Sequence, residues 1–434
     1  MTAPEPTVPP SSQERRSLGT RLTPSKRLRN ALLLSAFGLL LLSLVTMWTG
    51  SEQLTSSGTL GTALRLAIPI MLAGLGGIFA ERTGIINIGL EGMMILGTWF
   101  GAWGALTYGP WWGAVLGIVG GARGGLLHAI ATASFGIDQI VSGVAINILA
   151  AGVARFLAVL HFTPIGGGAT QSPRIPTSVP RLTAPVVAGG EVFGVQTPNL
   201  FGALEDTDVP LVSELGAIGL AFTRNVSAFT VIAVLLVPIF WYLLWRTTFG
   251  LRLRSVGEHP IGAESLGVNV YLMKYIGVTT SGALAGLGGA ILAIEAAGIY
   301  REGQTAGRGF IGLASMIFGN WRPGGVLMGA SLFGYANALE LRSGEAVHSL
   351  LLFVTVVLLI YGVTRYVQTR AASSLSLLAV GAVVGWAYVV TDSVPSQFVF
   401  FTPHLTTLVV LAFFSQRLRP PAAINQPYRR GQQI

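Results

Sequence analysis

ERTGIINIGLEG, residues 81–92, interrupts a long apolar region of the chain. The apolar run 62–80 precedes it, and a second run, 85–107, begins within it. A bilayer core about 30 Å thick requires about 20 apolar residues per helix, so each run is long enough to cross a membrane. The sequence therefore predicts two membrane-spanning helices joined by a tight turn, with Glu81 and Arg82 in the turn.

The composition of the whole chain supports a membrane protein. Of its 434 residues, 51% are hydrophobic and only 10% are charged, whereas soluble domains carry about 25% charged residues. The chain has 57 glycines, which let transmembrane helices approach closely. It has no cysteine, which excludes disulfides, thiolate metal sites and a cysteine nucleophile. The net charge of +9 falls in short segments between apolar runs, a pattern typical of membrane topology and not of nucleic-acid binding.

Twelve apolar runs predict an all-α integral membrane protein with about 10–12 transmembrane helices. The run 309–320 is short, so it either crosses or is re-entrant. With all runs crossing, arginines concentrate in the inner loops and both termini lie in the cytoplasm. The predicted spans are 31–48, 62–80, 85–107, 110–131, 138–160, 226–246, 275–299, 309–320, 323–341, 347–364, 374–391 and 396–414.

These spans divide the chain into consecutive parts. We expect a cytoplasmic basic arm over 1–30, a first transmembrane half over 31–161, an extracytoplasmic loop region over 162–225, a second transmembrane half over 226–341 with a cytoplasmic loop at 247–273, two extra spans within 342–395, and a last span with a cytoplasmic tail over 396–434.

The two halves contain similar short motifs in the same order. Ala-Gly-Leu-Gly-Gly occurs at 73–77 and again at 285–289, and Ile-Gly-Leu occurs at 88–90 and 311–313. In the predicted topology, the first copies run in the opposite direction to the second, so the repeat is inverted, an architecture common in transporters. Glycine-rich helices can also resemble one another by chance, and this alternative stays open.

Polar residues within the spans are the candidates for a solute pathway, because carboxylates inside a membrane usually face a bundle interior or water. On a continuous helix, Gly84, Asn87, Glu91 and Met94 would share one face. The same residues could instead be interhelical hydrogen-bond partners, and this alternative also stays open. The candidate pathway or gating residues are Glu81, Asn87, Glu91, Asn147 and Glu295.

The inner loop 251–268 contains a second candidate site. Pro260 suits the first turn of a short helix that ends near Gly267, and Glu264 falls in its middle. A short surface helix of this kind can dock into a groove on a partner protein, although an ordinary solvated loop is the alternative. The chain has no P-loop, no metal-ligand spacing and no nucleophile motif, so the sequence predicts no enzyme active site, no metal and no cofactor.

These motifs together resemble the permease subunits of bacterial ATP-binding-cassette (ABC) importers, in the nucleoside and simple-sugar branch of the branched-chain amino-acid and ribose permease family. The segments that carry the resemblance are 81–93, 254–267, 281–286, 307–323 and 427–431. The chain differs in its long segment 162–225 and its added spans within 347–391, and it meets the usual coupling-loop consensus only loosely at 262–267.

The resemblance implies a channel-forming subunit, most closely for nucleosides, that works by alternating access. It implies four partners: an ABC ATPase subunit, a second and different permease subunit, an extracytoplasmic solute-binding lipoprotein and membrane lipid. Simple sugars or branched-chain amino acids are alternative solutes, and an ion-coupled transporter using Glu91 and Glu295 is an alternative class. The residues expected to couple to the ATPase are Gly257, Glu258, His259, Pro260, Ala263, Glu264 and Gly267.

Overall fold

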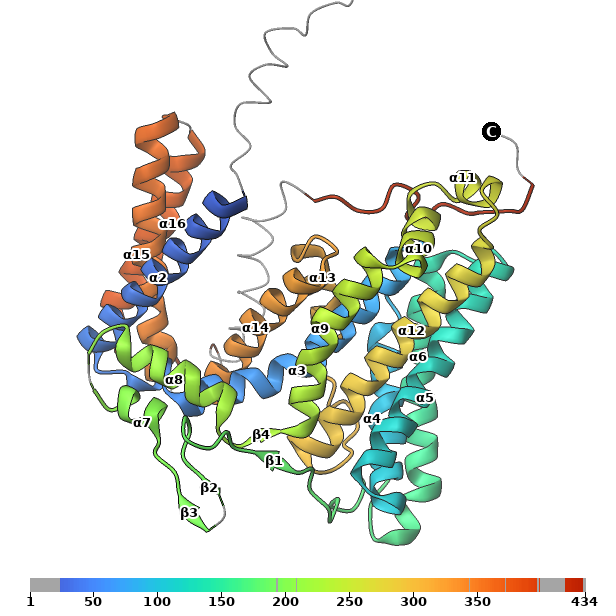
Figure 1. Ribbon diagram of the computed structural model, residues 1–434, viewed down its shortest axis with the longest axis horizontal. Coiled ribbons are helices and arrows are strands. Elements are labelled where there is room, and N and C mark those ends of the chain that lie inside the picture. Colours follow the sequence, from blue (N-terminus) through green and yellow to red (C-terminus); the bar gives the residue numbers. More distant parts are fainter. Residues whose placement is uncertain are drawn as a thin grey trace, which may run out of the picture.

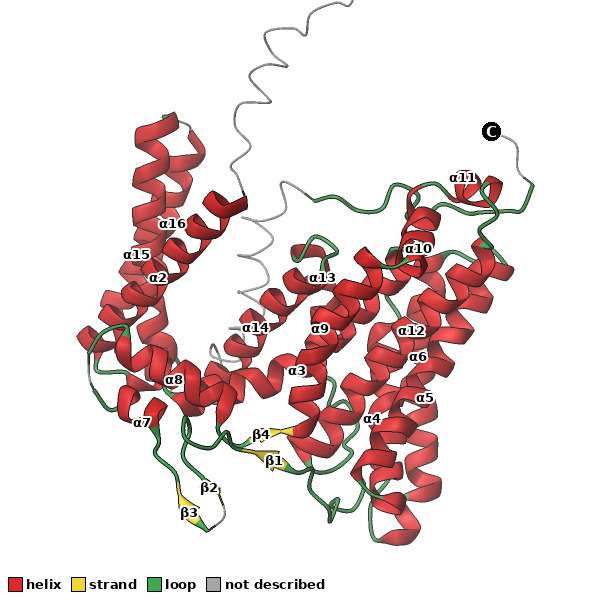
Figure 2. Cartoon of the chain, viewed as in Figure 1, coloured by secondary structure: helices red, strands yellow, loops and turns green. Residues whose placement is uncertain are grey.

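The computed structural model describes residues 24–431 apart from 193, 208, 343, 371, 396–397 and 399–417. These residues are almost entirely helical, and the strands form only two short antiparallel pairs (Figure 2). The predicted all-α membrane class is therefore confirmed. Among the described residues, six segments are long and apolar enough to cross a bilayer: Glu52–Glu81, Pro110–Ser134, Gln139–His161, Ala228–Arg246, Val270–Ala297 and Gly344–Gln368.

Most helices coincide with the predicted apolar runs within a few residues. They are α2 (Pro24–Thr49), α3 (Ser57–Glu81), α5 (Pro110–Ala129), α6 (Gln139–His161), α9 (Ala228–Arg246), α12 (Val270–Ile291), α14 (Pro323–Glu340), α15 (Gly344–Thr369) and α16 (Ala372–Val390). A π-helical turn prolongs α5 over Ile130–Ser134, and another prolongs α12 over Leu292–Ala297. The predicted last span, 396–414, and most of the basic arm lie outside the described residues.

Two of the predicted spans differ from the structure. The span predicted over 85–107 is wrong at its start, because α4 begins only at Leu90 and runs to Tyr108. Gly84 adopts a φ of 83°, which ends the helical path, so Asn87 does not lie on one helix face with Glu91. The run 309–320 forms α13 (Arg308–Phe318), whose 11 residues span about 16 Å. That length is too short to cross a bilayer unaided.

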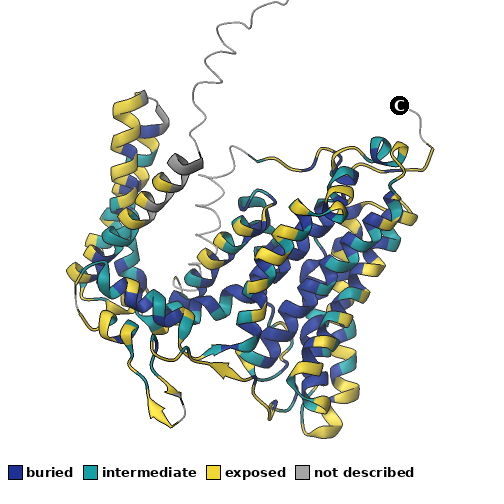
Figure 3. Ribbon diagram, viewed as in Figure 1, coloured by how far each residue is buried: buried dark blue, intermediate teal, exposed yellow. Residues whose placement is uncertain are grey.

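The core has the arrangement expected of an inverted repeat. α3 and α12 are antiparallel: a Cβ at Gly76 would lie 2.6 Å from the Ser281 carbonyl oxygen, and one at Gly288 would lie 2.9 Å from the Pro69 carbonyl oxygen. α12 packs against α4 and α5, and α3 packs against α13 and α14. The first helix of each repeat therefore packs on the later helices of the other, and α3 is buried over most of its length (Figure 3).

Glycines set the distance between α12 and its neighbours. Gly282 and Gly286 of α12 interleave with Gly121 and Gly125 of α5, and a Cβ at Gly282 would lie 2.8 Å from the Gly125 Cα. Small residues at such contacts let backbones pack closely in a membrane, where lipid supplies no hydrophobic drive between helices. The interface therefore depends on the absence of side chains.

The segment 162–225 is more structured than the sequence predicts. Besides a short 3₁₀ turn at Thr163–Ile165, it contains α7 (Leu200–Glu205) and α8 (Val212–Thr223). Strands β2 (Glu191–Val192) and β3 (Val195–Gln196) form a hairpin, and β1 (Arg181–Leu182) pairs with β4 (Val226–Ser227). This end of the molecule is called here the hairpin face (Figure 1).

The opposite end carries α10 (Thr248–Glu258) and α11 (Pro260–Ser265), and is called here the α11 face (Figure 1). A third group of helices, α2, α15 and α16, stands to one side of the core (Figure 1). α15 joins α2 and the short turn Glu52–Leu54 through an apolar cluster that includes Val45, Leu54 and Val347. The two extra spans thus extend the bundle at one side and leave the repeats uninterrupted.

We predict that Gly286→Ala destabilises the protein, because a methyl group there would meet the backbone of α5. Overpacking of this kind costs roughly 1–3 kcal/mol of unfolding free energy. Gly152→Ala on α6 is the matched control, since a Cβ at Gly152 has no atom within 4 Å. Thermal unfolding of the detergent-purified proteins measures both, and equal stability of the two variants would contradict the close packing.

Candidate functional site

The predicted short helix on the α11 face forms where the sequence places it. Pro260 is its first residue, and the His259 Nδ1 accepts the Gly262 N–H at 2.8 Å, which caps the start of the helix. Gly267 follows with a φ of 81°, a conformation that ends helices and favours glycine. Ala263 is buried and holds the helix against the rest of the face. The predicted helix from Pro260 to near Gly267 is therefore confirmed.

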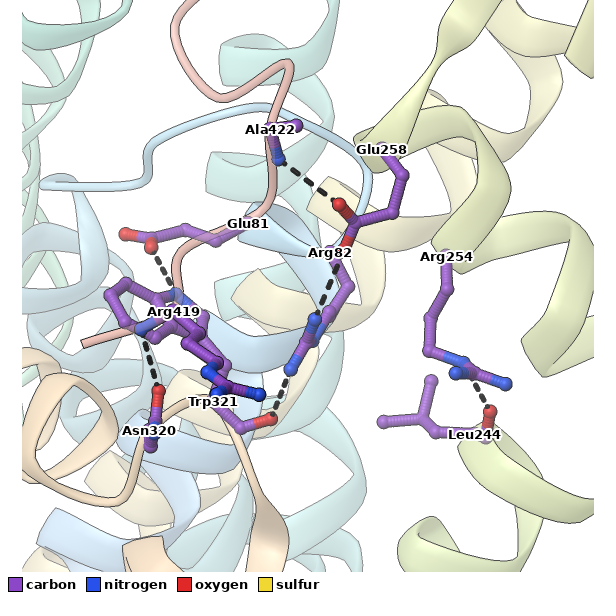
Figure 4. A network of polar contacts seen from close by, with 9 residues as sticks. All are labelled: Glu81, Arg82, Leu244, Arg254, Glu258, Asn320, Trp321, Arg419 and Ala422. Carbon is purple, nitrogen blue, oxygen red and sulfur yellow. Dashed lines mark hydrogen bonds and ion pairs between the residues drawn. The ribbon is translucent and has the colours of Figure 1, made fainter. Parts of the chain in front are cut away.

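A polar network connects α10 to the end of α3 and to the α13–α14 turn (Figure 4). Arg82 pairs with Glu258 at 3.5 Å, and it also donates to the Trp321 carbonyl oxygen at 3.1 Å. The indole N–H of Trp321 in turn donates to the Glu81 carboxylate at 2.6 Å. Glu81 on α3 is thus linked to the second repeat through the buried Trp321, and Arg82 links the same turn to the exposed Glu258 of α10.

Two glycines allow the backbones in this network to approach. Gly257 lies directly against the Arg82 carbonyl, where a Cβ would overlap it. A Cβ at Gly84 would lie 2.9 Å from the Ala423 carbonyl oxygen. Larger residues at Gly257 or Gly84 would separate α10, the α3–α4 turn and the chain near Ala423.

Two arginines pack on one tryptophan beside the network. The guanidinium groups of Arg82 and Arg254 lie 5.5 and 5.4 Å from the Trp245 ring centroid. Arg254 Nε donates to the Leu244 carbonyl oxygen at 2.9 Å, which fixes α10 to the end of α9 (Figure 4). These contacts hold α10 in one orientation relative to the core.

The segment 418–431 near the C-terminus crosses the α11 face and is called here the tail. The Arg419 N–H donates to Asn320 Oδ1 at 2.9 Å, and the Ala422 N–H donates to Glu258 Oε2 at 3.2 Å (Figure 4). The Ala423 N–H donates to the Gly257 carbonyl oxygen at 2.9 Å. The tail is therefore bound to the α13–α14 turn and to α10.

The far part of the tail packs against α11 and the start of α12. Arg430 Nε lies 3.5 Å from Glu264 Oε1, and the Tyr428 ring lies 5.4 Å from the Tyr271 ring. Burial raises the pKa of the Tyr428 hydroxyl, and its hydrogen bond to Glu264 raises it further. Both effects favour the protonated hydroxyl, the form that can donate to Glu264.

Inside the bundle, Glu91 satisfies the first turn of α13. Its two carboxylate oxygens accept the Gly307 N–H at 2.9 Å and the Gly309 N–H at 2.7 Å. Glu91 itself belongs to α4, and only 7% of it is exposed. A helix that starts within a membrane leaves backbone N–H groups unsatisfied, so a carboxylate from the other repeat stabilises it through these bonds and the helix dipole.

Asn147 has the equivalent role for α4. Its Oδ1 accepts the Gly92 N–H at 2.7 Å, and its Nδ2 donates to the Ile88 carbonyl oxygen at 3.1 Å. Asn87 Nδ2 donates to Ser281 Oγ on α12 at 2.8 Å. α4 and α13 both begin inside the bundle and are called here the broken helices. The backbone N–H groups at their starts are thus accepted by side chains from other helices.

Comparison with known proteins identifies the chain. A family described as the permease component of the branched-chain amino acid transport system matches residues 59–362, more than half of the chain. The chain belongs to this permease family. The resemblance found in the sequence is therefore confirmed at the level of the family.

Three relatives cover nearly the whole permease at 32% identity each. The guanosine ABC transporter permease protein NupQ of Bacillus subtilis aligns over 84% of this chain and 94% of its own. The nucleoside ABC transporter permease protein NupC of Lactococcus lactis aligns over 83% and 93%, and the putative glucose ABC transporter permease protein TsgC13 of Haloferax volcanii over 86% and 98%. No solved structure matches the chain significantly.

In the permease, the five predicted pathway residues do not meet in one cavity. Glu81 belongs to the α11-face network, whereas Asn87, Glu91 and Asn147 lie at the broken-helix starts. Glu295 lies near the hairpin face, where it accepts the Ser227 hydroxyl at 2.7 Å. Each makes an interhelical or interloop hydrogen bond, which supports the packing alternative, and their role in a pathway stays a prediction.

The seven predicted coupling residues, by contrast, lie together on the α11 face. The structure adds partners that the sequence analysis did not assign: Arg82 and Trp321 on the core side, and Ala422, Ala423, Tyr428 and Arg430 in the tail. The motif at 427–431 was the only sequence signal for the tail, and spacing alone could not place it beside α11.

Glu91→Ala is predicted to destabilise the permease, because two N–H groups of α13 would lose their acceptors inside the bundle. Loss of such a cap costs about 0.5–2 kcal/mol. Glu91→Gln keeps one acceptor oxygen and is expected to lose less stability, which thermal unfolding would measure. A Glu91→Gln protein with unchanged stability and no transport would instead place the charge of Glu91 in the solute pathway.

Proposed function

We propose that this permease is the channel-forming subunit of an ABC importer for nucleosides, driven by a separate ATPase through α11. The observation that carries this proposal is the α11 face itself. There, a short half-buried helix follows α10 directly, and α10 is joined by an ion pair, a backbone hydrogen bond and a close glycine contact to the end of α3 and to the tail. Arg82 extends the connection to the α13–α14 turn of the second repeat. Two of the relatives that cover most of the chain are named as guanosine or nucleoside permeases.

The contacts on this face suggest how motion passes into the membrane. A displacement of α11 moves α10, because only His259 separates the two helices. α10 acts on the end of α3 through Glu258 and Arg82, and Arg82 acts on the α13–α14 turn through the Trp321 carbonyl. Both inverted repeats therefore respond to one push, which is what switching the pathway between the two sides of the membrane requires.

In the proposed importer, the permease has one orientation in the membrane. The α11 face lies in the cytoplasm against the ATPase, and both termini lie on that side. The hairpin face lies outside the cell membrane, where segment 162–225 contacts a solute-binding lipoprotein. A second permease subunit completes the channel within the membrane. The binding protein supplies the selectivity, so this chain binds solute only weakly.

A sugar is the second candidate solute, favoured by the relative named as a putative glucose permease. Ion-coupled transport has less support, because both oxygens of Glu91 already accept backbone N–H groups. The accompanying binding protein decides between nucleoside and sugar: calorimetry with guanosine and with glucose distinguishes them directly.

We predict that replacing 260–267 with a glycine-serine linker of equal length abolishes nucleoside uptake while the permease still reaches the membrane. The physical reason is that α10 keeps its contacts with Arg82 but loses the helix on which the ATPase acts. Uptake of labelled guanosine by cells expressing the complete importer measures this.

Thr364→Ala on α15 is the control, because the exposed Thr364 hydroxyl donates only within its own helix, to the Tyr361 carbonyl oxygen, and α15 stands to one side of the core. It is expected to transport normally. Uptake that continues with the linker in place, or without any ATPase subunit, would refute coupling through α11.

A further inference from the structure

The tail contacts four separate elements of the α11 face. Within its described part it binds the α13–α14 turn through Asn320, the α3–α4 turn through Gly84, α10 through Gly257 and Glu258, and α11 through Glu264. The tail is therefore built into the same surface that carries the coupling helix.

One apolar side chain stands out on this surface. Leu266, directly after α11, is 86% exposed. α11 contains the apolar residues Pro260, Ile261 and Ala263 and lies next to the start of α12, at the outer edge of the α11 face (Figure 1). Because Leu266 lies away from the core, its side chain would leave water only by packing against another molecule.

A pocket of about 180 Å³ separates α11 from the tail close to this leucine. Its lining includes Glu264 and Gly267 on one side and Tyr428 and Arg430 on the other. The two sides are held together by the Glu264–Arg430 pair and by the Tyr428 hydrogen bond. The pocket would not exist without the tail.

The tail places two arginines beside the pocket. Arg429 and Arg430 are both exposed, and Arg430 lines the pocket and pairs with Glu264. The pairing carboxylate of Glu264 is only half-buried. Arginines around an apolar anchor are typical of protein interfaces, where they favour a partner with acidic groups at the rim of its groove.

We propose that α11 with Leu266 and tail residues 427–430 form one composite docking surface for the ATPase subunit, and that the tail supplies half of it. This rests on the proposed function. The partner surface is an apolar groove that takes Leu266, with carboxylates placed opposite Arg429 and Arg430. The Glu264–Arg430 pair positions the tail and holds the two halves of the surface in register.

The test measures how much ATPase co-purifies with the full-length permease, expressed with all its partner subunits. Arg430→Glu is expected to reduce the recovered ATPase, because it places two carboxylates together. The exchange Glu264→Arg with Arg430→Glu restores the pair and is expected to recover part of the ATPase. Leu266→Lys is expected to reduce it in either background.

Arg155→Glu is the matched control, because the Arg155–Glu302 pair has the same 3.5 Å separation but lies away from the α11 face. It should leave ATPase recovery unchanged. ATPase recovery that is normal with Arg430→Glu and Leu266→Lys overturns the composite surface, as does an exchange variant no better than the single one. A wild-type permease that recovers no ATPase would instead overturn the proposed function.

Discussion

The close approach of backbones along α12 is the constraint on which the rest of the structure depends. α12 of the second repeat lies between α3 on one side and α4 and α5 on the other, all three from the first repeat, and glycines form the contacts on both sides. In a bilayer, helices gain little from burying apolar side chains, so close van der Waals contact has to hold the bundle together. The positions of α3, α4 and α5 relative to one another therefore depend on how near α12 allows them to lie.

Helices that begin inside the bundle leave backbone N–H groups that need acceptors, and side chains of other helices provide them. α4 and α13 begin inside the bundle, and their first N–H groups would be unsatisfied there. Asn147 and Glu91 accept these groups, each from a different helix. The same polar residues that look like solute ligands in the sequence therefore make the fold possible, and a solute pathway has to be sought among groups that are not occupied in this way.

The sequence predicted the fold class, most helix boundaries and the inverted repeat, because apolar run length and repeated glycine motifs report directly on membrane helices. The prediction was wrong at the start of α4, because the length of an apolar run does not reveal the turn at Gly84. The coupling helix was predictable from Pro260 and Gly267, since both act locally. Its surroundings were not, because Arg430 reaches Glu264, and Trp321 reaches Arg82 beside α10, only through the tertiary fold, and periodicity carries no information about such pairs.

The tail joins residues near the end of the chain to α10 and α11, more than 150 positions earlier in the sequence. Glu258 accepts the Ala422 N–H with one carboxylate oxygen and pairs with Arg82 through the other. One side chain therefore anchors the tail and the end of α3 at the same time. A displacement of α10 that shifts Glu258 would loosen both attachments together, so the tail cannot keep its place while α10 moves away from α3.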